Sequence, residues 1–300
     1  MNKLFCFGYG YSCDYLGHEL LGHGGWHVLG TTRDHVKKDA LSQRGVKAYI
    51  FDYEHPLADP ALILKDVTHL LISTPPNDHG DPTFQAHGHD ILNMPNLKWI
   101  GYLSTTGVYG NREGEWIDEA AELRPSSKRG SRRLRAEEQW MSLFHAHGLP
   151  VHIFRLAGIY GPGRSALDSI RAGVARRIDK PGHVFSRIHV EDIVQVLLAS
   201  MNRPHPGAAY NVCDDVPAPS HEVISYACRL LSKPEPPLIP FDQADMSPMA
   251  RSFYGDNKRL KNALIKDELG IELKYKNYEE GLRACLAAEE HALKLFSLPA

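Results

Sequence analysis

Glycines near the start of the chain have the spacing of a phosphate-binding turn. The segment Phe7-Gly8-Tyr9-Gly10-Tyr11-Ser12-Cys13 lies between a short apolar run and an amphipathic stretch. Gly8 permits a tight turn there, and Gly10 lets the backbone approach a pyrophosphate, which would then lie at a helix N-terminus. Cys13 takes the third small position of the pattern. The spacing predicts a dinucleotide site, with an ordinary tight turn as the alternative. Its expected contacts are Gly8, Gly10, Tyr11 and Ser12.

The end of the second apolar run bears on the choice of dinucleotide. Sites for NAD carry an acidic residue there, which accepts hydrogen bonds from the ribose hydroxyls. This chain instead has Thr32 and Arg33, and a hydroxyl beside a guanidinium suits a 2′-phosphate. We therefore expect NADP rather than NAD, although Asp34 follows one place later and could still favour NAD.

Polar residues also follow the third and fourth apolar runs. Asp52 ends the third run, where its carboxylate could accept from the adenine amino group or simply cap a turn. Ser73, Thr74 and Pro75 end the fourth run, and Pro76 follows. Because two neighbouring prolines stop a strand, we expect this segment to form a wall beside the cofactor.

Short apolar runs alternate with longer amphipathic stretches and carry these candidate residues at their ends. This alternation predicts an α/β fold, with a doubly wound parallel Rossmann sheet. Beyond residue 160 Pro and Gly recur, which indicates a small C-terminal substrate-side cap. We place an NAD(P)-binding domain at 1–162, rejoined by about 187–215, and the cap at 163–186 and 216–300. The expected strands are 3–7, 27–30, 46–51, 69–73, 99–104 and 151–155, and the expected helices 12–24, 132–147, 191–202, 220–232 and 279–295.

Several motifs together resemble the extended short-chain dehydrogenase/reductases, which include the nucleotide-sugar epimerases and dehydratases. They are Leu103-Ser-Thr-Thr-Gly-Val-Tyr-Gly110, Arg155–Arg164, Arg187–Ile193, and Tyr210-Asn-Val212 followed by Asp214 and Asp215. The fourth run, ending in Ser-Thr-Pro-Pro, is similar to the atypical, epimerase-like members. The resemblance implies an NAD(P)-dependent oxidoreductase or epimerase. Its substrate would be nucleotide-sugar-like or carry another polar carbonyl or hydroxyl.

The chain departs from this family at the catalytic Tyr-x-x-x-Lys. The Tyr position holds Arg129 and the Lys position holds Arg133, while the family's Ser falls on Thr105, whose hydroxyl can still orient a substrate oxygen. Arg cannot shuttle a proton, because its pKa above about 12 keeps it charged. Arg133 could serve as a ribose-binding cation and Arg129 could bind an anion. The rival interpretation is therefore a catalytically impaired NADP(H)-binding sensor or regulatory protein.

Two other tyrosines could replace the missing phenol. Tyr109 and Tyr160 follow predicted strands, where ligands of such folds bind, but each could instead pack the cofactor wall with its hydroxyl satisfied. A literal Tyr254-x-x-x-Lys258 also occurs. We interpret it as a chance match in a loop before a helix at 259–269.

Two polar segments have weaker implications. His79, His87 and His89 lie with three aspartates in a segment that we expect to be a mobile substrate-side loop with solvated histidines; their spacing fits no common zinc pattern, so we expect no metal. The basic run 128–135 lacks interleaved aromatic residues. A phosphate-bearing substrate or a solvated helix start explains it better than nucleic acid does.

Composition sets the remaining expectations. Lys and Arg minus Asp and Glu give 34 − 36 = −2, which is no footprint for duplex nucleic acid. The five cysteines form no CxxC pair, as expected of buried thiols in a reducing compartment. No apolar run is long enough for a membrane span. We expect a cytoplasmic protein with a small-molecule substrate and without nucleic-acid or membrane partners; a homodimer is left open.

Overall fold

The computed structural model describes residues 1–297, and the chain divides into two compact units. The first comprises Met1–Val108, Pro125–Arg155 and Val194–Tyr210, and the second comprises Tyr109–Arg124, Leu156–Ile193 and the chain from Asn211 onward. The domain boundaries expected from the sequence stay a prediction about which residues serve the cofactor and which serve the substrate.

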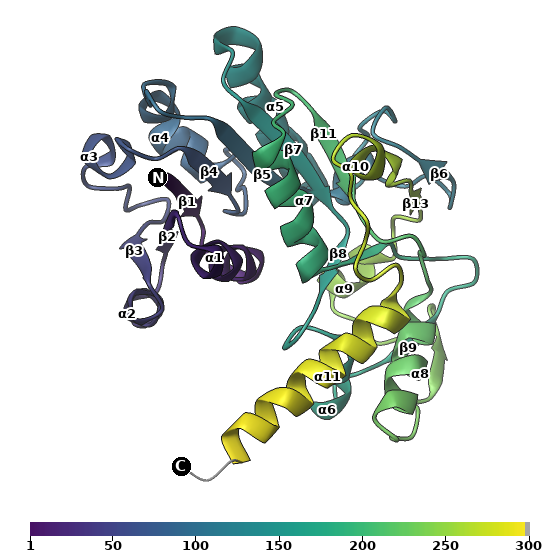
Figure 1. The fold of residues 1–300 in the computed structure, drawn as a ribbon. Helices are drawn as coiled ribbons and strands as arrows, with labels where there is room; N and C mark the ends of the chain where they lie inside the picture. Colours follow the sequence, from purple (N-terminus) through teal and green to yellow (C-terminus); the bar gives the residue numbers. More distant parts are fainter. Residues whose placement is uncertain (298–300) are drawn as a thin grey trace. The chain divides into compact units, whose positions relative to one another are not determined.

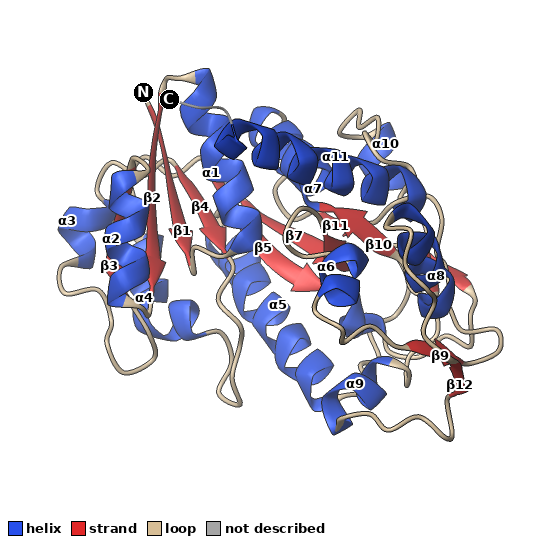
Figure 2. Cartoon of the chain, turned by 90° about the horizontal axis from the view of Figure 1, so that it is seen from below, coloured by secondary structure: helices blue, strands red, loops and turns tan. Residues whose placement is uncertain are grey.

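The main sheet has seven strands, and its order defines the fold class. The strands are β1 (Asn2–Phe7), β2 (Trp26–Thr32), β3 (Val46–Ile50), β4 (His69–Ile72), β5 (Trp99–Thr105), β7 (Val151–Leu156) and β11 (Ala209–Val212). Their order is β11-β7-β5-β4-β1-β2-β3 (Figure 1). The pairings from β3 through β5 are parallel, and the arrows of β1, β2 and β4 point the same way in Figure 2. The predicted doubly wound parallel sheet is confirmed.

Helices follow the strands as the alternation predicted. They are α1 (Tyr11–His23), α2 (His35–Gln43), α3 (Pro60–Leu64), α4 (Pro82–Leu92), α5 (Lys128–His147) and α7 (Val190–Asn202), with a short 3-10 turn, η1 (Thr106–Tyr109), after β5.

Helices pack on both faces of the main sheet. Side chains alternate along each strand, so successive residues face opposite sides of the sheet. Phe5 and Phe7 of β1 join a buried apolar cluster with Ile91 of α4 and Trp140 of α5. Trp99 of β5 donates instead from Nε1 to Ser200 Oγ of α7, at 3.0 Å. With both faces packed, the carboxyl ends of the strands remain for a ligand, at the point where strand order reverses between β1 and β4.

The segment 79–89 is not the mobile loop that the sequence indicated. Most of it belongs to α4, whose N-cap is Asp81 and whose first residue is proline. His87 is buried, and its Nε2 accepts from the backbone N–H of Leu57 at 3.1 Å. The expectation of a solvated His87 was therefore wrong: Asp followed by Pro is a helix-start signal, and the buried face of that helix includes residue 87. Within residues 1–297, no group of three His, Cys, Asp or Glu residues is arranged to hold a metal ion.

The second unit is built of short elements around its own core. Buried residues of that core include Tyr160, Leu167, Ile224 and Leu282. The predicted helix at 259–269 is shorter than expected, because residues 259–260 pair as a strand. The elements are β6 (Trp116–Ile117), β8 (Gly158–Tyr160), α6 (Ala166–Arg171), β9 (Arg177–Asp179), β10 (Arg187–His189), α8 (Ser220–Leu230), β12 (Leu238–Pro240), α9 (Pro248–Phe253), β13 (Arg259–Leu260), α10 (Ala263–Asp267) and α11 (Tyr278–Ser297).

All five cysteines are buried thiols. Among the helices described within residues 1–297, none is both long enough and apolar enough to span a membrane.

Candidate functional site

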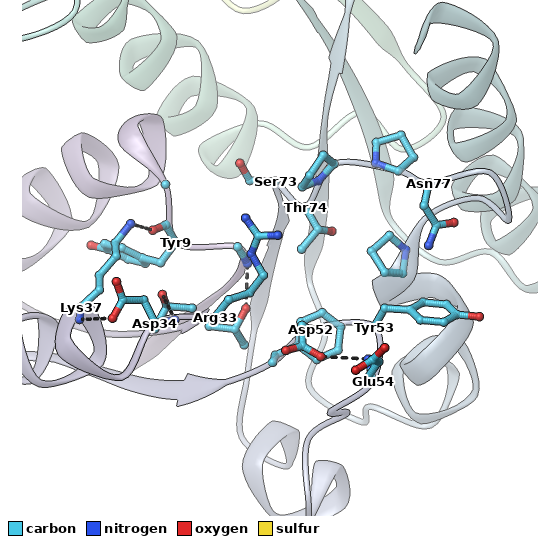
Figure 3. A pocket seen from close by; sticks show the side chains of 18 of the residues that line it. Tyr9, Arg33, Asp34, Lys37, Asp52, Tyr53, Glu54, Ser73, Thr74 and Asn77 are labelled. Atoms are coloured by element: carbon cyan, nitrogen blue, oxygen red, sulfur yellow. Dashed lines mark hydrogen bonds between the residues drawn. The ribbon is translucent and has the colours of Figure 1, made fainter. Parts of the chain in front are cut away.

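A cavity of about 1070 Å³ opens at the carboxyl ends of β1 to β4, entirely within the first unit (Figure 3). Most of the residues predicted to contact the cofactor line it. They are Gly8, Gly10, Thr32, Arg33, Asp52, Ser73, Thr74 and Pro75. Tyr11 and Ser12 are not among the lining residues and form the first turn of α1.

Backbone geometry at Gly8 fixes the glycine-rich turn. Gly8 has φ +79°, and a Cβ there would come within 3.1 Å of the backbone nitrogen of Thr74. The N–H of Gly8 donates to Thr31 Oγ1 at 2.8 Å, and the N–H of Tyr9 donates to the Thr31 carbonyl at 2.7 Å. Only glycine therefore fits at position 8. These hydrogen bonds to Thr31 were not predicted, because they depend on how β2 pairs with β1.

The start of α1 has the features of an anion site. Gly10 is the N-cap and supplies no side-chain hydrogen bond to the first turn, whereas Asp34 caps α2 and Asp81 caps α4. A Cβ at Gly10 would meet only the Gly8 carbonyl oxygen, at 3.8 Å. An uncapped helix start keeps N–H groups available for an anion, and the open space at Gly10 lies on the cavity wall. The residues present therefore fit the pyrophosphate of a dinucleotide.

The side chain of Tyr9 supports this turn from inside the protein. Tyr9 is 2% exposed and fills the space left by two glycines. A Cβ on Gly17 of α1 would overlap the Tyr9 hydroxyl, and a Cβ on Gly30 of β2 would lie 2.6 Å from the ring carbon Cδ2. The position of Tyr9 was not predicted. Gly17 and Gly30, small residues in a helix and a buried strand, were the only signal in the sequence.

Asp34, the acidic residue after β2, forms hydrogen bonds with the backbone at the start of α2. Asp34 Oδ1 accepts from the N–H groups of Val36 and Lys37, at 2.8 and 3.3 Å, and so caps α2. Arg33 is exposed at the cavity, and Lys37 also lines it while donating from Nζ to the Tyr9 carbonyl at 2.7 Å. Two cations thus lie on the side of the cavity where β2 ends (Figure 3).

Asp52 lies at the cavity and also forms hydrogen bonds within its own turn. Its Oδ1 accepts from the N–H groups of Glu54 and His55 at 2.9 Å, and His55 Nδ1 lies 2.8 Å away. The hydrogen bond with His55 holds the pKa of the Asp52 carboxyl below its ordinary value. Asp52 therefore caps a turn, as one interpretation held, and it also lines the cavity.

Three of the candidate catalytic residues belong to the first unit. Thr105 is half-buried at the end of β5, and its Oγ1 accepts from the Gly107 N–H at 3.2 Å. Arg129 is exposed in the first turn of α5. Arg133, one turn further, donates from Nη1 to the Leu103 carbonyl at 2.8 Å and to the Tyr102 hydroxyl at 3.1 Å. The guanidinium of Arg133 is thus attached to β5.

A buried polar network lies directly before Thr105, and we did not predict it. Ser104 donates from Oγ to the carboxylate of Glu137 on α5. Arg155 of β7 pairs with the same carboxylate, with Nη2 and Oε2 2.9 Å apart. Because both charges are buried, loss of either one would leave the other uncompensated. The network fixes the end of β5. Ser104 and Arg155 belong to the sequence motifs, but their contact with Glu137 is long-range.

The other tyrosine candidates lie in the second unit. The Tyr109 hydroxyl donates to Asn211 Oδ1 at 2.7 Å, and Tyr109 is fully buried. The Tyr160 hydroxyl donates to the Asn277 carbonyl at 3.4 Å. Burial, together with the Asp214 charge, raises the pKa of the Tyr160 phenol well above its ordinary value. These contacts match the interpretation of tyrosines with satisfied hydroxyls. Their catalytic role stays a prediction.

The literal Tyr-x-x-x-Lys segment belongs to the second unit as well. Tyr254 directly follows α9, and its ring contacts those of His183 and Phe185, with centroids 5.3 and 5.2 Å apart. Lys258 donates from Nζ to the Gly110 carbonyl at 2.9 Å. Both residues therefore take part in the packing of this unit.

Comparison with known proteins places these features in context. A model of the NAD dependent epimerase/dehydratase family matches residues 92–213. Protein YeeZ of Escherichia coli (strain K12) is 29% identical over 265 residues, which cover 84% of this chain and 88% of that protein. The solved structure of a functionally unknown conserved protein from Silicibacter pomeroyi DSS is 49% identical. It covers 96% of this chain and 99% of its own, with a TM-score of 0.89.

More distant structures share the fold. UDP-glucuronic acid 4-epimerase from Bacillus cereus, solved in complex with UDP-glucuronic acid and NAD, is 15% identical and has a TM-score of 0.78. The match covers 97% of this chain and 99% of the epimerase. Sheet order, glycine-rich turn and cavity define a Rossmann-type α/β protein. The match of residues 92–213 to the NAD dependent epimerase/dehydratase family model is in keeping with the resemblance that the motifs carry.

Proposed function

We propose that this protein is an NAD(P)-dependent oxidoreductase or epimerase-like enzyme that binds its dinucleotide in the cavity of the first unit. The observation that carries this proposal is the uncapped start of α1 beside open space at Gly10, on the wall of a cavity of about 1070 Å³. When bound there, the nicotinamide would supply or accept a hydride. The remaining roles belong to the residues of the chain.

We assign the preference for NADP to Arg33, with Lys37 beside it. Both side chains line the cavity, and the carboxylate of Asp34 is engaged in capping α2. A 2′-phosphate brings extra negative charge, which a guanidinium can bind through charge-assisted hydrogen bonds. Asp34 would therefore repel this phosphate less strongly than an acidic side chain that points at the ribose would.

We assign roles at the reacting end of the site to the residues at and near the positions that the resemblance gives to the Tyr–Lys pair. Thr105 would hold the reacting oxygen, and Arg129, exposed at the start of α5, would meet an anionic group of the substrate. Arg133 would act mainly through β5, since Leu103 and Tyr102 bind its guanidinium. Proton transfer would fall to another phenol, for which Tyr109 and Tyr160 stay the candidates.

The substrate class is proposed from similarity and charge. The epimerase from Bacillus cereus was solved with a nucleotide sugar and NAD, and MoeE5, with a TM-score of 0.78, was solved with UDP-glucose and NAD. We propose a nucleotide-sugar-like substrate or another polar carbonyl or hydroxyl compound, bound by residues of 163–186 and 216–300. A cytoplasmic location is in keeping with five buried thiols.

Calorimetric titration of the purified full chain tests the proposal. NADPH, NADH and, as a control, free AMP are titrated separately into the protein. We expect saturable one-to-one binding of NADPH, weaker binding of NADH and much weaker binding of AMP. Failure of both dinucleotides to bind the folded protein would contradict the proposed function.

A further inference from the structure

Tyr53 is an exposed aromatic residue on the wall of the cavity. It follows Asp52 shortly after β3, and it is 59% exposed while it also lines the cavity. In Figure 3 Tyr53 lies with Asp52 on the side of the cavity opposite Lys37. A large ring that leaves so much surface open at a cavity wall offers a face on which a flat ligand can stack.

A second ring orients this tyrosine. His79, which follows β4, lies with its ring centroid 6.3 Å from that of Tyr53, and the two planes differ by only 19°. A base inserted between two rings needs about 7 Å, which is twice the usual carbon–carbon contact distance. The two rings are closer than that. A base would therefore stack on the face that Tyr53 turns to the cavity, and His79 would support the ring.

The turn that carries His79 is fixed by several contacts. Asn77 and Gly80 exchange backbone hydrogen bonds of 2.9 and 3.2 Å, and the His79 N–H donates to Asn77 Oδ1 at 2.8 Å. Asp78 is held from α5, with its Oδ1 2.6 Å from Arg132 Nη2 and 3.1 Å from Lys128 Nζ. The support for Tyr53 is thus attached to both β4 and α5.

We propose that Tyr53 is the stacking platform for the adenine base of the dinucleotide and that His79 is a positioning residue, which holds the Tyr53 ring. This inference rests on the proposed function. It places adenine beside Asp52, at the far side of the cavity from Lys37. Stacking recognises the flat face of a base and not its edge, so Tyr53 contributes affinity while any reading of the amino group is left to Asp52.

Titrations with two ligands test the role of Tyr53. NADPH and reduced nicotinamide mononucleotide, which lacks adenosine, are titrated into the wild type, Tyr53→Ala and Tyr53→Phe. Tyr53→Ala should weaken NADPH binding about five- to hundredfold, because a stacked base contributes about 1–3 kcal/mol and about 1.4 kcal/mol is tenfold. Its affinity for the mononucleotide should not change. Tyr53→Phe should bind NADPH as the wild type does.

A double-mutant cycle tests the role of His79. His79→Ala should weaken NADPH binding a few-fold in the wild type and have no effect in the Tyr53→Ala background, because its action passes through the tyrosine ring. His79→Phe should retain the wild-type affinity. An equal loss from His79→Ala in both backgrounds would overturn the positioning role.

The controls separate this inference from the proposed function. Trp116 is also exposed but lies in the second unit, so Trp116→Ala should leave NADPH binding unchanged. If the wild type binds NADPH and Tyr53→Ala binds it equally well, only the stacking platform is overturned. The same holds if Tyr53→Ala weakens both ligands equally. If the wild type binds no dinucleotide, the proposed function itself fails.

Discussion

Arg133 Nη1 donates to the carbonyl oxygen of Leu103 at 2.8 Å and joins α5 to β5. The guanidinium carbon also lies 5.5 Å from the centre of the Tyr102 ring, and its hydroxyl accepts from Nη1. Both hydrogen bonds come from one nitrogen, Nη1, which the planar guanidinium holds in a fixed geometry. These contacts tie the Arg133 cation to β5.

Restoring the Tyr–Lys pair that the resemblance implies should restore fast turnover. We expect Arg129→Tyr combined with Arg133→Lys to raise the rate of nicotinamide reduction by about 10²–10⁴-fold, the usual effect of general acid–base assistance. The rate is measured against a set of UDP- and dTDP-sugars, with thermal melting to verify folding. The matched control adds Thr105→Ala, which should remove the gain. No gain in a folded double variant would show that the lost pair does not limit the rate.

Arg33 should set the preference between the two dinucleotides. Loss of a charge-assisted contact to a 2′-phosphate costs roughly 1.5–3 kcal/mol, so Arg33→Ala should weaken NADPH binding by about ten- to hundredfold and leave NADH nearly unchanged. Arg44, which pairs with Asp14 at 2.8 Å and does not line the cavity, provides the control variant Arg44→Ala. An unchanged ratio of the two affinities in Arg33→Ala would contradict the assignment.

Asp214 should make the stability of the protein depend on pH. Asp214 is 1% exposed; burial raises its pKa from 3.8 to about 8, and the Arg187 guanidinium offsets part of this rise. The unfolded chain therefore loses this proton at lower pH than the folded chain does, and the stabilising contribution of the protonated carboxyl falls as pH rises from about 4 to 8.

Urea unfolding of the wild type and Asp214→Asn across this pH range measures that contribution. We expect the wild type to lose stability relative to the variant as pH rises from about 4 to 8. Parallel curves for the two proteins would show that the carboxyl titrates alike in the folded and unfolded states.

The contacts of Tyr9 predict a selective rescue. Gly17→Ala should destabilise the protein by about 1–3 kcal/mol, as overpacking does, because the new methyl group overlaps the Tyr9 hydroxyl. Tyr9→Phe removes that oxygen and should recover most of the loss. Gly30→Ala meets the ring itself, so the same change should not rescue it. Thermal melts of the single and double variants measure both cases; equal rescue of the two glycine variants would contradict this packing.

The ends of the strands were predictable, because a polar residue comes directly after each short apolar run. Residues such as Thr32, Asp52 and Ser73 therefore fell at the cavity. The expected helices 12–24 and 132–147 were found as α1 and α5, whereas α2 and α3 were not predicted. The start of α4 was missed although Asp81 and Pro82 form a local signal, because the histidines and aspartates that follow were taken as a polar loop.

Long-range contacts set the limit of that prediction. Glu137 of α5 contacts Ser104 of β5 and Arg155 of β7. These three residues lie on separate elements, so no local sequence spacing predicts their contact. Tyr53 could have been singled out because it follows Asp52, but its exposure and its parallel contact with His79 depend on two strand ends lying together. Local sequence was enough to predict the residues of the site, whereas their contact partners depend on the order of the strands in the sheet.

Binding of NADPH to Gly10→Val tests the dinucleotide site most directly. Gly10 has φ −101° and open space beyond its Cα, so valine should fold there and fill the volume reserved for the pyrophosphate. The matched control is Gly22→Val, at an exposed position of the same helix with nothing within 4 Å of a Cβ. We predict at least a hundredfold loss of NADPH affinity (about 2.7 kcal/mol) in folded Gly10→Val and wild-type affinity in Gly22→Val. Unchanged affinity in folded Gly10→Val would contradict the cofactor site.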